Sequence, residues 1–236
     1  MGIVSKLAFR RRWKAWVIGG VVALAVLVVG VPFAYIHLFN SDQPAALSLD
    51  SSNGTASSAA TVPDNGTWKV GAGSTTGYRV HEILAGQSTT AVGRTNSVTG
   101  DIVISGSAVT TGSFTVDMTT VKSNKSQRDG QFQRRIMQTA TYPTATFTLT
   151  KPIELGSAPA VGKTVTPTAT GNLTLHGTTK SVTFALQAVR NGNTIKVQGS
   201  IPVTFSDYNI SSPSLAGFVT VDNNGTMEFL LDFVPA

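Results

Sequence analysis

The sequence predicts an all-β fold: an antiparallel β-barrel of about eight strands with one short helix, preceded by a single transmembrane helix. Three observations predict it. A long uncharged apolar stretch lies near the N-terminus, short runs of alternating apolar and polar residues follow one another after residue 67, and one charged segment at 126–137 has helical spacing instead. We therefore expect four parts: a basic tail (1–15), a membrane helix (16–39), a flexible tether (40–66) and a folded domain (67–236).

The apolar stretch from Trp16 to Phe39 is long enough, as a helix, to cross a hydrocarbon core of ~30 Å. A cluster of basic residues precedes it and no comparable cluster follows it, which predicts a cytoplasmic N-terminus and an extracytoplasmic domain. We expect a single-pass signal-anchor in the cell membrane, with cleavage after the span as the alternative. Residues 41–66 are rich in Ser, Ala, Asn, Gly and Pro without apolar periodicity, and this composition predicts the flexible tether.

Composition excludes several classes of function. The formal net charge is +6, but five of the 18 basic residues lie before position 15. The folded domain therefore lacks the concentrated positive charge that a nucleic-acid interface needs, and we expect no nucleic-acid partner. The chain contains no cysteine, which excludes disulfide bonds, thiolate catalysis and cysteine-ligated zinc.

The β-like runs each place their apolar residues at one parity. The clearest runs are 114–118, 145–149, 173–175, 182–186, 195–203 and 227–233. Such period-two patterns indicate antiparallel strands with one dry face and one solvated face. Gly-containing links at 176–180 and 191–193 suit hairpins. Consecutive hairpins favour a closed barrel over a two-sheet sandwich, because closure removes strand edges.

The segment SQRDGQFQRRIM (126–137) interrupts the strands and raises the question of an active site. Ser126 and Asp129 match a helix-capping pattern, and Phe132 and Ile136 have the spacing of residues that dock on a core. Asp129 is then a structural acid. The alternative is a general base, but the sequence shows no partner for that role. We expect the segment to pack across a barrel end or wall as a plug that lines the interior.

Few residues of the domain are candidates for chemistry. Its two histidines, His81 and His176, belong to no catalytic or zinc-binding pattern, so we expect no metal, no cofactor and no enzymatic activity. His176 precedes a glycine in an expected turn, which predicts an exposed rim position, and His81 has outward parity. Glu82 has inward parity, so it either marks a binding site or lies at an exposed strand end. The candidates for a polar mouth are Glu82, Arg79, Arg94 and His176.

Five stretches together resemble the YceI-like family: TGYRVHEIL (76–84), TAVGRTNSVTGDI (90–102), RDGQF (128–132), TYPTATFTL (141–149) and GNLTLHGTTKSVTFAL (171–186). They occur in order over roughly 68–233. The form VGRT…VTG is similar to the actinobacterial variant of the family, here with a membrane anchor in front. The resemblance implies an extended lipocalin-like barrel whose apolar interior holds a long-chain amphiphile, such as a polyisoprenoid or an isoprenoid quinone.

Parity then assigns the interior residues that contact such a lipid: Phe114, Val116, Met118, Phe132, Phe147, Leu149, Leu173, Leu175, Phe184, Leu186 and Phe229. We predict a membrane-tethered, extracytoplasmic lipid-binding protein that serves storage, transport or stress protection. Its partners are a long-chain amphiphilic lipid and the cytoplasmic membrane, and a homodimer is left open. Two alternatives remain. One is an envelope protein-interaction or sensing module with a solid core, and the other is an enzyme on envelope lipids with Asp129, Glu82 or His176 as acid–base groups.

Overall fold

The computed structural model describes residues 17–30, 43–49, 65–84, 86–156, 161–212 and 219–236. Its N-terminal part is α-helical over 17–25 and continues as a π-helix, η1 (Val26–Gly30). Within the described ranges, no helix is both long enough and apolar enough to cross a membrane. The basic tail, residue 16 and residues 31–39 of the predicted span lie outside the described residues, so the membrane helix stays a prediction.

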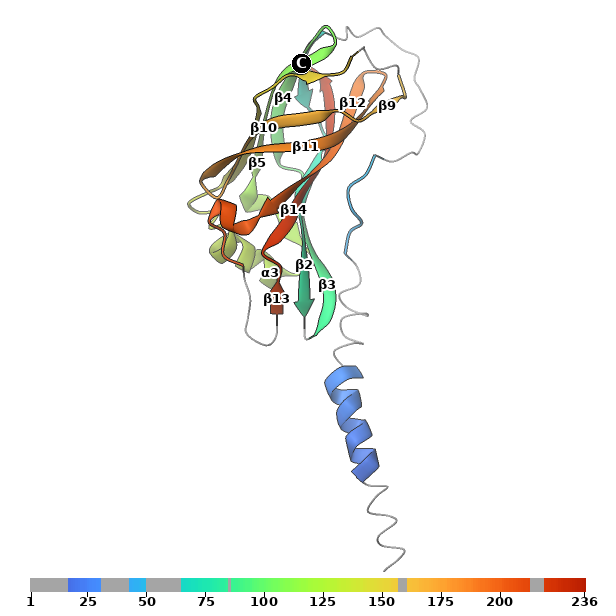
Figure 1. The fold of residues 1–236 in the computed structure, drawn as a ribbon, viewed down its shortest axis with the longest axis vertical. Coiled ribbons are helices and arrows are strands. Elements are labelled where there is room, and N and C mark those ends of the chain that lie inside the picture. Colours follow the sequence, from blue (N-terminus) through green and yellow to red (C-terminus); the bar gives the residue numbers. More distant parts are fainter. Residues whose placement is uncertain (1–16, 31–42, 50–64, 85, 157–160, 213–218) are drawn as a thin grey trace, which may run out of the picture.

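Most of the remaining described chain forms one antiparallel sheet (Figure 1). Its longer strands are β1 (Gly66–Val70), β2 (Thr75–Leu84), β3 (Gln87–Thr95), β4 (Val98–Ser105), β5 (Ala108–Asp117), β7 (Thr144–Leu149), β10 (Thr168–Leu175), β11 (Thr178–Asn191), β12 (Thr194–Thr204) and β14 (Asn224–Pro235). Shorter strands pair at its margins: β6 (Lys122–Ser123), β8 (Ile153–Glu154), β9 (Thr164–Val165) and β13 (Val219–Val221). The helical elements of the domain are η2 (Met118–Thr120), α3 (Ser126–Gln131), η3 (Phe132–Ile136) and η4 (Phe205–Tyr208).

Eight strands close into a ring in the order β1, β4, β5, β7, β10, β11, β12 and β14. The closing pair is β1 with β14, in which Trp68 lies opposite Pro235. Strand β14 also pairs with β2, in which Glu228 lies opposite Gly77, and β3 follows β2. β2 and β3 thus extend the barrel wall beyond the ring. The predicted all-β fold, a closed antiparallel barrel of about eight strands, is confirmed.

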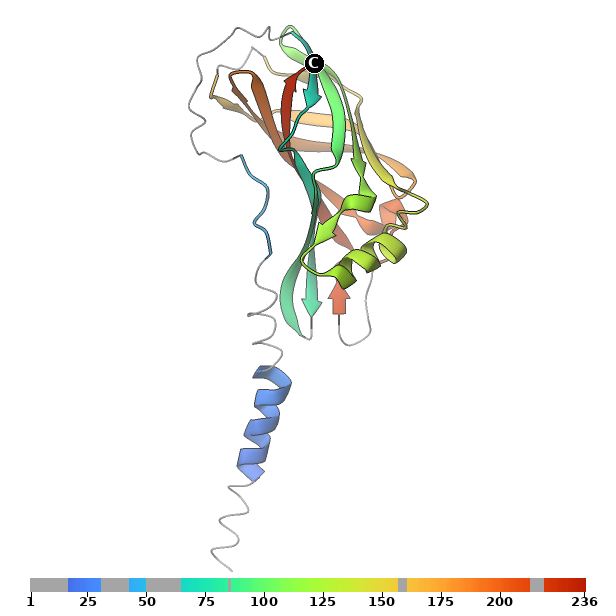
Figure 2. The same cartoon turned by 180° about the vertical axis from the view of Figure 1, so that it is seen from behind.

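The two ends of the barrel differ. At one end lie α3, β13 and the turn between β2 and β3; we call it the α3 end (Figure 1). At the opposite end lie the β4–β5 turn at Gly106 and the β11–β12 turn at Gly192; we call it the Gly106 end. Figure 2 shows the helical segment α3–η3 lying across the wall at the α3 end, where the sequence predicted a plug.

The alternating sequence explains which face of each strand is dry. In β12, Ile201 and Val203 are buried, whereas the alternate residues Ser200, Pro202 and Thr204 are exposed. Gly199 shares their parity and lies opposite Phe229 of β14. A Cβ atom at Gly199 would come within 2.5 Å of the Phe229 ring, so only glycine allows the aromatic ring to lie over this strand.

The start of α3 differs from the predicted capping pattern. Ser126 is the first helical residue rather than the N-cap, which is Lys125 and makes no side-chain capping bond. Asp129 instead reaches back to β6, where its Oδ1 accepts hydrogen bonds from the Ser123 backbone N–H (2.8 Å) and hydroxyl (2.7 Å). The carboxylate is buried and ties α3 to the strand before it. These contacts are those of a structural acid, the role that we predicted for Asp129.

Candidate functional site

Two cavities lie end to end inside the barrel. The first has a volume of about 180 Å³ and is lined by the ring strands; we call it the apolar cavity. The second has a volume of about 130 Å³ and lies at the α3 end; we call it the α3-end cavity. Thr76, Val116 and Met227 line both cavities and so form the neck between them. The barrel interior is therefore hollow on both sides of this neck.

The apolar cavity is enclosed almost wholly by aliphatic and aromatic side chains. A belt of phenylalanines from four strands surrounds it. Phe147 of β7 stacks on Phe114 (ring centroids 6.4 Å apart) and meets Phe184 edge-to-face (5.5 Å), and Phe184 meets Phe229 in the same way (5.9 Å). Edge-to-face pairs hold rings in fixed orientations, so the belt gives the cavity a defined shape.

The α3-end cavity ends in a pair of opposite charges. Arg128 of α3 and Glu82 of β2 both line it, and the Arg128 Nη2–Glu82 Oε1 distance is 2.9 Å. Arg128 also donates from Nη1 to Asn124 Oδ1 (2.8 Å), which fixes the guanidinium. Tyr78 lies on the same wall and stacks on Phe132, with ring centroids 5.0 Å apart. This cavity thus combines an aromatic wall with a charged end.

The electrostatics of Tyr78 reflect this environment. Burial raises the pKa of Tyr78 from 10.0 to about 12; Arg128 opposes the shift, and Asp129 and Glu82 add to it. The shift extends the range over which the phenol is protonated, and hence a hydrogen-bond donor, into the alkaline region above pH 10. The pKa of Tyr208 in η4 is also raised. Burial is the larger cause, and the negative charge of Asp207 adds to it.

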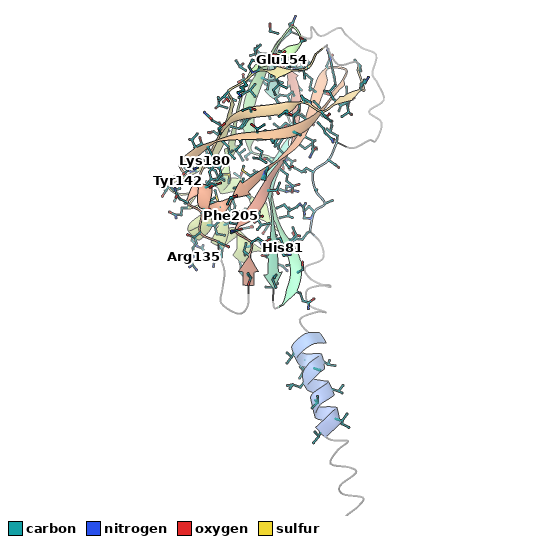
Figure 3. The ribbon with its side chains drawn as sticks, in the orientation of Figure 1. His81, Arg135, Tyr142, Glu154, Lys180 and Phe205 are labelled. Carbon is teal, nitrogen blue, oxygen red and sulfur yellow. The ribbon has the colours of Figure 1, made fainter. Side chains whose placement is uncertain are left out.

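The structure brings all eleven predicted interior residues to the cavities. Those on the apolar cavity are Phe114, Val116, Phe147, Leu149, Leu173, Phe184, Leu186 and Phe229. Those on the α3-end cavity are Val116, Met118, Phe132 and Leu175, where Figure 3 also labels Phe205 of η4. Their contact with a lipid stays a prediction.

The four candidates for a polar mouth do not meet at one place. Glu82 faces inward and lines the α3-end cavity, as its parity predicted. Arg79 and Arg94 lie on the outer face of the barrel, where both bind Glu228 of β14 (3.1 and 2.6 Å). The reason is the period of a strand: Arg79 is an odd number of positions from Glu82 and so points to the other face.

His176 is not the exposed rim residue that we expected, because it is only 8% exposed. Its backbone has a positive φ of 50°, and the turn folds against η4, where Nδ1 donates to the Tyr208 carbonyl oxygen (3.1 Å). The Tyr142 ring lies edge-on to the imidazole at 4.6 Å. His176 does not line either of the two cavities.

His81 lies on the outer face at the α3 end, as its parity predicted (Figure 3). Its ring nitrogens contact Asp222 (3.2 Å) and Ser88 (2.9 Å). Within the described residues, no group of three or more His, Asp or Glu side chains has the arrangement of a metal site.

The sequence analysis missed two residues of the charged end. Arg128 was part of the segment that we interpreted as a plug, and Tyr78 was considered only as part of the stretch TGYRVHEIL (76–84). The inward parity of Tyr78 and Glu82 was the available signal. Nothing in the sequence indicates that a helix 46 positions away brings Arg128 to the same cavity.

Comparisons with known proteins agree with this geometry. A family model described as the YceI-like domain matches residues 68–233. Among solved structures, a polyisoprenoid-binding domain from Saccharophagus degradans, implicated in plant cell wall breakdown, is similar over 73% of this chain and 99% of its own, with 18% identity and a TM-score of 0.59. BcnA from Burkholderia cenocepacia is similar over 66% of this chain and 95% of its own, with 21% identity and a TM-score of 0.51. No curated protein matched the sequence.

Proposed function

The chain belongs to the YceI-like domain family, and from that premise we propose that its barrel encloses a long-chain isoprenoid-type lipid, such as a polyisoprenoid or an isoprenoid quinone. One observation carries the proposal: two cavities lie end to end, and the one at the α3 end carries the ion pair of Glu82 and Arg128. This arrangement suits an amphiphile whose apolar chain occupies the apolar cavity while its polar head lies at Glu82 and Arg128. The polyisoprenoid-binding description of the Saccharophagus degradans domain supports the same ligand class.

The energetics favour chain enclosure. Each buried CH₂ group contributes about 0.8 kcal/mol, so even a few isoprene units bind with useful affinity. An apolar cavity of about 150 Å³ is large enough to hold a benzene molecule. The cavities here are of that order, so a long prenyl chain needs the neck residues to move apart or leaves part of itself outside the barrel. Hollow space on this scale weighs against a module with a solid core.

We further propose that the protein is a membrane-tethered carrier or reservoir on the extracytoplasmic side. The basic cluster before the predicted span Trp16–Phe39 supports this orientation. Anchoring raises the local concentration of the barrel at the bilayer that supplies the lipid. The reaction is reversible binding, and no group of the site is assigned a catalytic role.

Native mass spectrometry of the full chain, purified in mild detergent from a native-like host, tests lipid enclosure. We expect one added mass per chain, and solvent extraction identifies it as a prenyl lipid. A chain that carries no lipid and takes up neither added polyprenol nor added quinone would overturn the proposal.

The Phe132→Asp variant adds a matched test, because Phe132 lines the α3-end cavity. We expect this variant to lose the lipid or to lose stability. Gln131→Asp introduces the same charge one residue earlier at an exposed position, and we expect it to keep both lipid and stability.

A further inference from the structure

We propose that the outer face of the barrel carries a docking site for residues 43–49 of the same chain, and that this docking directs the α3 end toward the membrane. The docking site consists of Arg79 of β2, Arg94 of β3 and Glu228 of β14. The sequence predicted a flexible tether over 40–66, and within that range residues 43–49 contact all three of these side chains. The orientation rests on the proposed membrane anchor, whereas the docking does not.

The sheet register builds the docking site. Glu228, Gly77 and Arg94 lie in one row across three neighbouring strands. Gly77 has no side chain, so the Arg94 stem crosses β2 and its Nη2 reaches Glu228 Oε1 at 2.6 Å. A Cβ atom at Gly77 would lie only 1.9 Å from the Gly93 carbonyl oxygen and 3.0 Å from Arg94 Cδ, so the backbone of β3 and the Arg94 stem both require glycine here. Arg79, two residues further along β2, binds the same oxygen at 3.1 Å.

The three side chains offer what an extended peptide needs. Two guanidinium groups face one carboxylate, and the surplus N–H donors bind backbone carbonyl oxygens: Arg79 Nη2 donates to Pro44 O (2.8 Å) and Arg94 Nη2 to Ala45 O (3.4 Å). The free carboxylate oxygen, Glu228 Oε2, accepts from the Leu47 N–H at 3.0 Å. With the segment docked Glu228 is only 4% exposed, so the bond between the Leu47 N–H and the carboxylate is shielded from water.

The direction of the docked segment follows from the same contacts. Pro44 contacts Arg79, which lies opposite Thr226 of β14. Leu47 contacts Glu228 of β14, which is two residues nearer the Gly106 end than Thr226. The segment therefore runs from the α3 end toward the Gly106 end, as the two views of the ribbon also show (Figures 1 and 2). Residue 43, the first of the docked segment, is accordingly its end nearest the α3-end cavity.

This direction changes the length of the link to the predicted membrane helix. With the span ending at Phe39, only residues 40–42 separate it from the docked segment. Three extended residues reach about 10 Å, whereas a flexible link over all of 40–66 has an average span of roughly 30 Å and no preferred direction. Docking therefore holds the charged end of the lipid site close to the bilayer surface.

Hydrogen exchange of the Leu47 amide in the full chain tests the docking. We expect Leu47 to exchange at least about tenfold more slowly than in the free peptide, since its partner is a buried carboxylate. Arg79→Gln/Arg94→Gln should remove this protection. Lys180→Gln/Lys196→Gln removes the same charge on β11 and β12 and should keep it. If the Leu47 amide of the unaltered chain exchanges as fast as in the free peptide, the docking is overturned.

The orientation is tested in vesicles with single cysteines, which the cysteine-free chain allows without background labelling. Dyes go on Thr220→Cys, at the exposed β13 of the α3 end, and on Asn193→Cys, in the exposed β11–β12 turn. We expect a headgroup quencher to act more strongly at 220 than at 193. Leu47→Pro deletes the N–H donor without touching the barrel and should reduce this difference.

Equal quenching at both positions, or a difference that survives Leu47→Pro, overturns the orientation. If the chain does not float with the vesicles, the membrane anchor fails and the orientation fails with it. Lipid enclosure and Leu47 exchange are measured separately in detergent, so failure of the proposed function is distinguished from failure of the docking.

Discussion

The two cavities belong to one barrel, yet different kinds of side chain line them. The apolar cavity is enclosed by a belt of phenylalanines and aliphatic residues, whereas the α3-end cavity ends in Arg128 and Glu82. An apolar wall can discriminate only by length and volume, because dispersion and burial are nearly indifferent to chemistry. A fixed charged pair can discriminate by hydrogen bonding, since an unmatched partner leaves buried polar groups unpaired. Under the proposed function, the apolar cavity would select the lipid chain and the α3-end cavity would select the head group.

The largest expected effect comes from splitting the charged pair. Arg128→Ala leaves Glu82 buried without its partner, and we expect a loss of about 3–5 kcal/mol in the free energy of unfolding, measured by urea denaturation at pH 7. Removing both charges, in Glu82→Gln/Arg128→Met, should cost much less. Arg135→Ala truncates an exposed arginine of the same helical segment and should change little (Figure 3). Equal losses in Arg128→Ala and Arg135→Ala would contradict the distinction between the cavities.

The next effect is the alkaline behaviour of Tyr78. Because burial raises the folded-state pKa to about 12, the folded chain keeps a proton that the unfolded chain releases above 10.0. The stability of the unsubstituted protein should therefore fall as pH rises from 10 to 12, by about 2–3 kcal/mol from this group. Tyr78→Phe lacks this loss. Parallel stability curves for the two proteins over that range would show that the phenol is not held in a buried environment.

Filling the apolar cavity should produce a smaller effect: a loss of lipid affinity that depends on the length of the lipid chain and not on its head group. Ala169 of β10 is buried on this cavity, so Ala169→Leu displaces about three methylene groups of ligand and weakens lipid binding by about 2 kcal/mol. Ala185→Leu makes the same substitution at an exposed position of the neighbouring strand β11 and serves as the control. Titration with prenyl alcohols of increasing length measures the change. A loss of affinity that depends on the head group rather than the chain length would contradict the distinction between the two cavities.

The smallest effect is expected outside the barrel. His81 and Asp222 form an exposed pair at 3.2 Å, with 45% and 44% of their side chains accessible. Exposed ion pairs contribute about 0–1 kcal/mol, so His81→Ala should lower stability by no more than that and leave lipid affinity unchanged. An affinity loss of about tenfold, which corresponds to about 1.4 kcal/mol, would show that polar selection is not confined to the inner pair.

Sequence reasoning succeeded where the relevant property is local. The inward set, from Phe114 on β5 to Phe229 on β14, was predicted because side-chain parity depends only on neighbouring residues in a strand. The closed barrel followed from the hairpin order. Pairings between distant residues have no such local signal, which is why the Arg128–Glu82 contact and the outer Arg94–Glu228 contact were not predicted. His176 was assigned wrongly because a turn residue is normally exposed, and the sequence does not reveal that η4 folds over it.

Closure of the ring by β1 and β14 has a consequence for folding kinetics. Trp68 must meet Pro235 before the barrel exists, so the decisive contact joins residues from the two ends of the domain. Such high contact order makes folding slow, because the entropy of closing a long loop is lost before the favourable contacts between its ends have formed. During that delay the apolar strand faces are exposed and prone to aggregate. A lipid that binds only the closed ring acts after closure: by mass action it lowers the fraction of chains that reopen and expose these faces again.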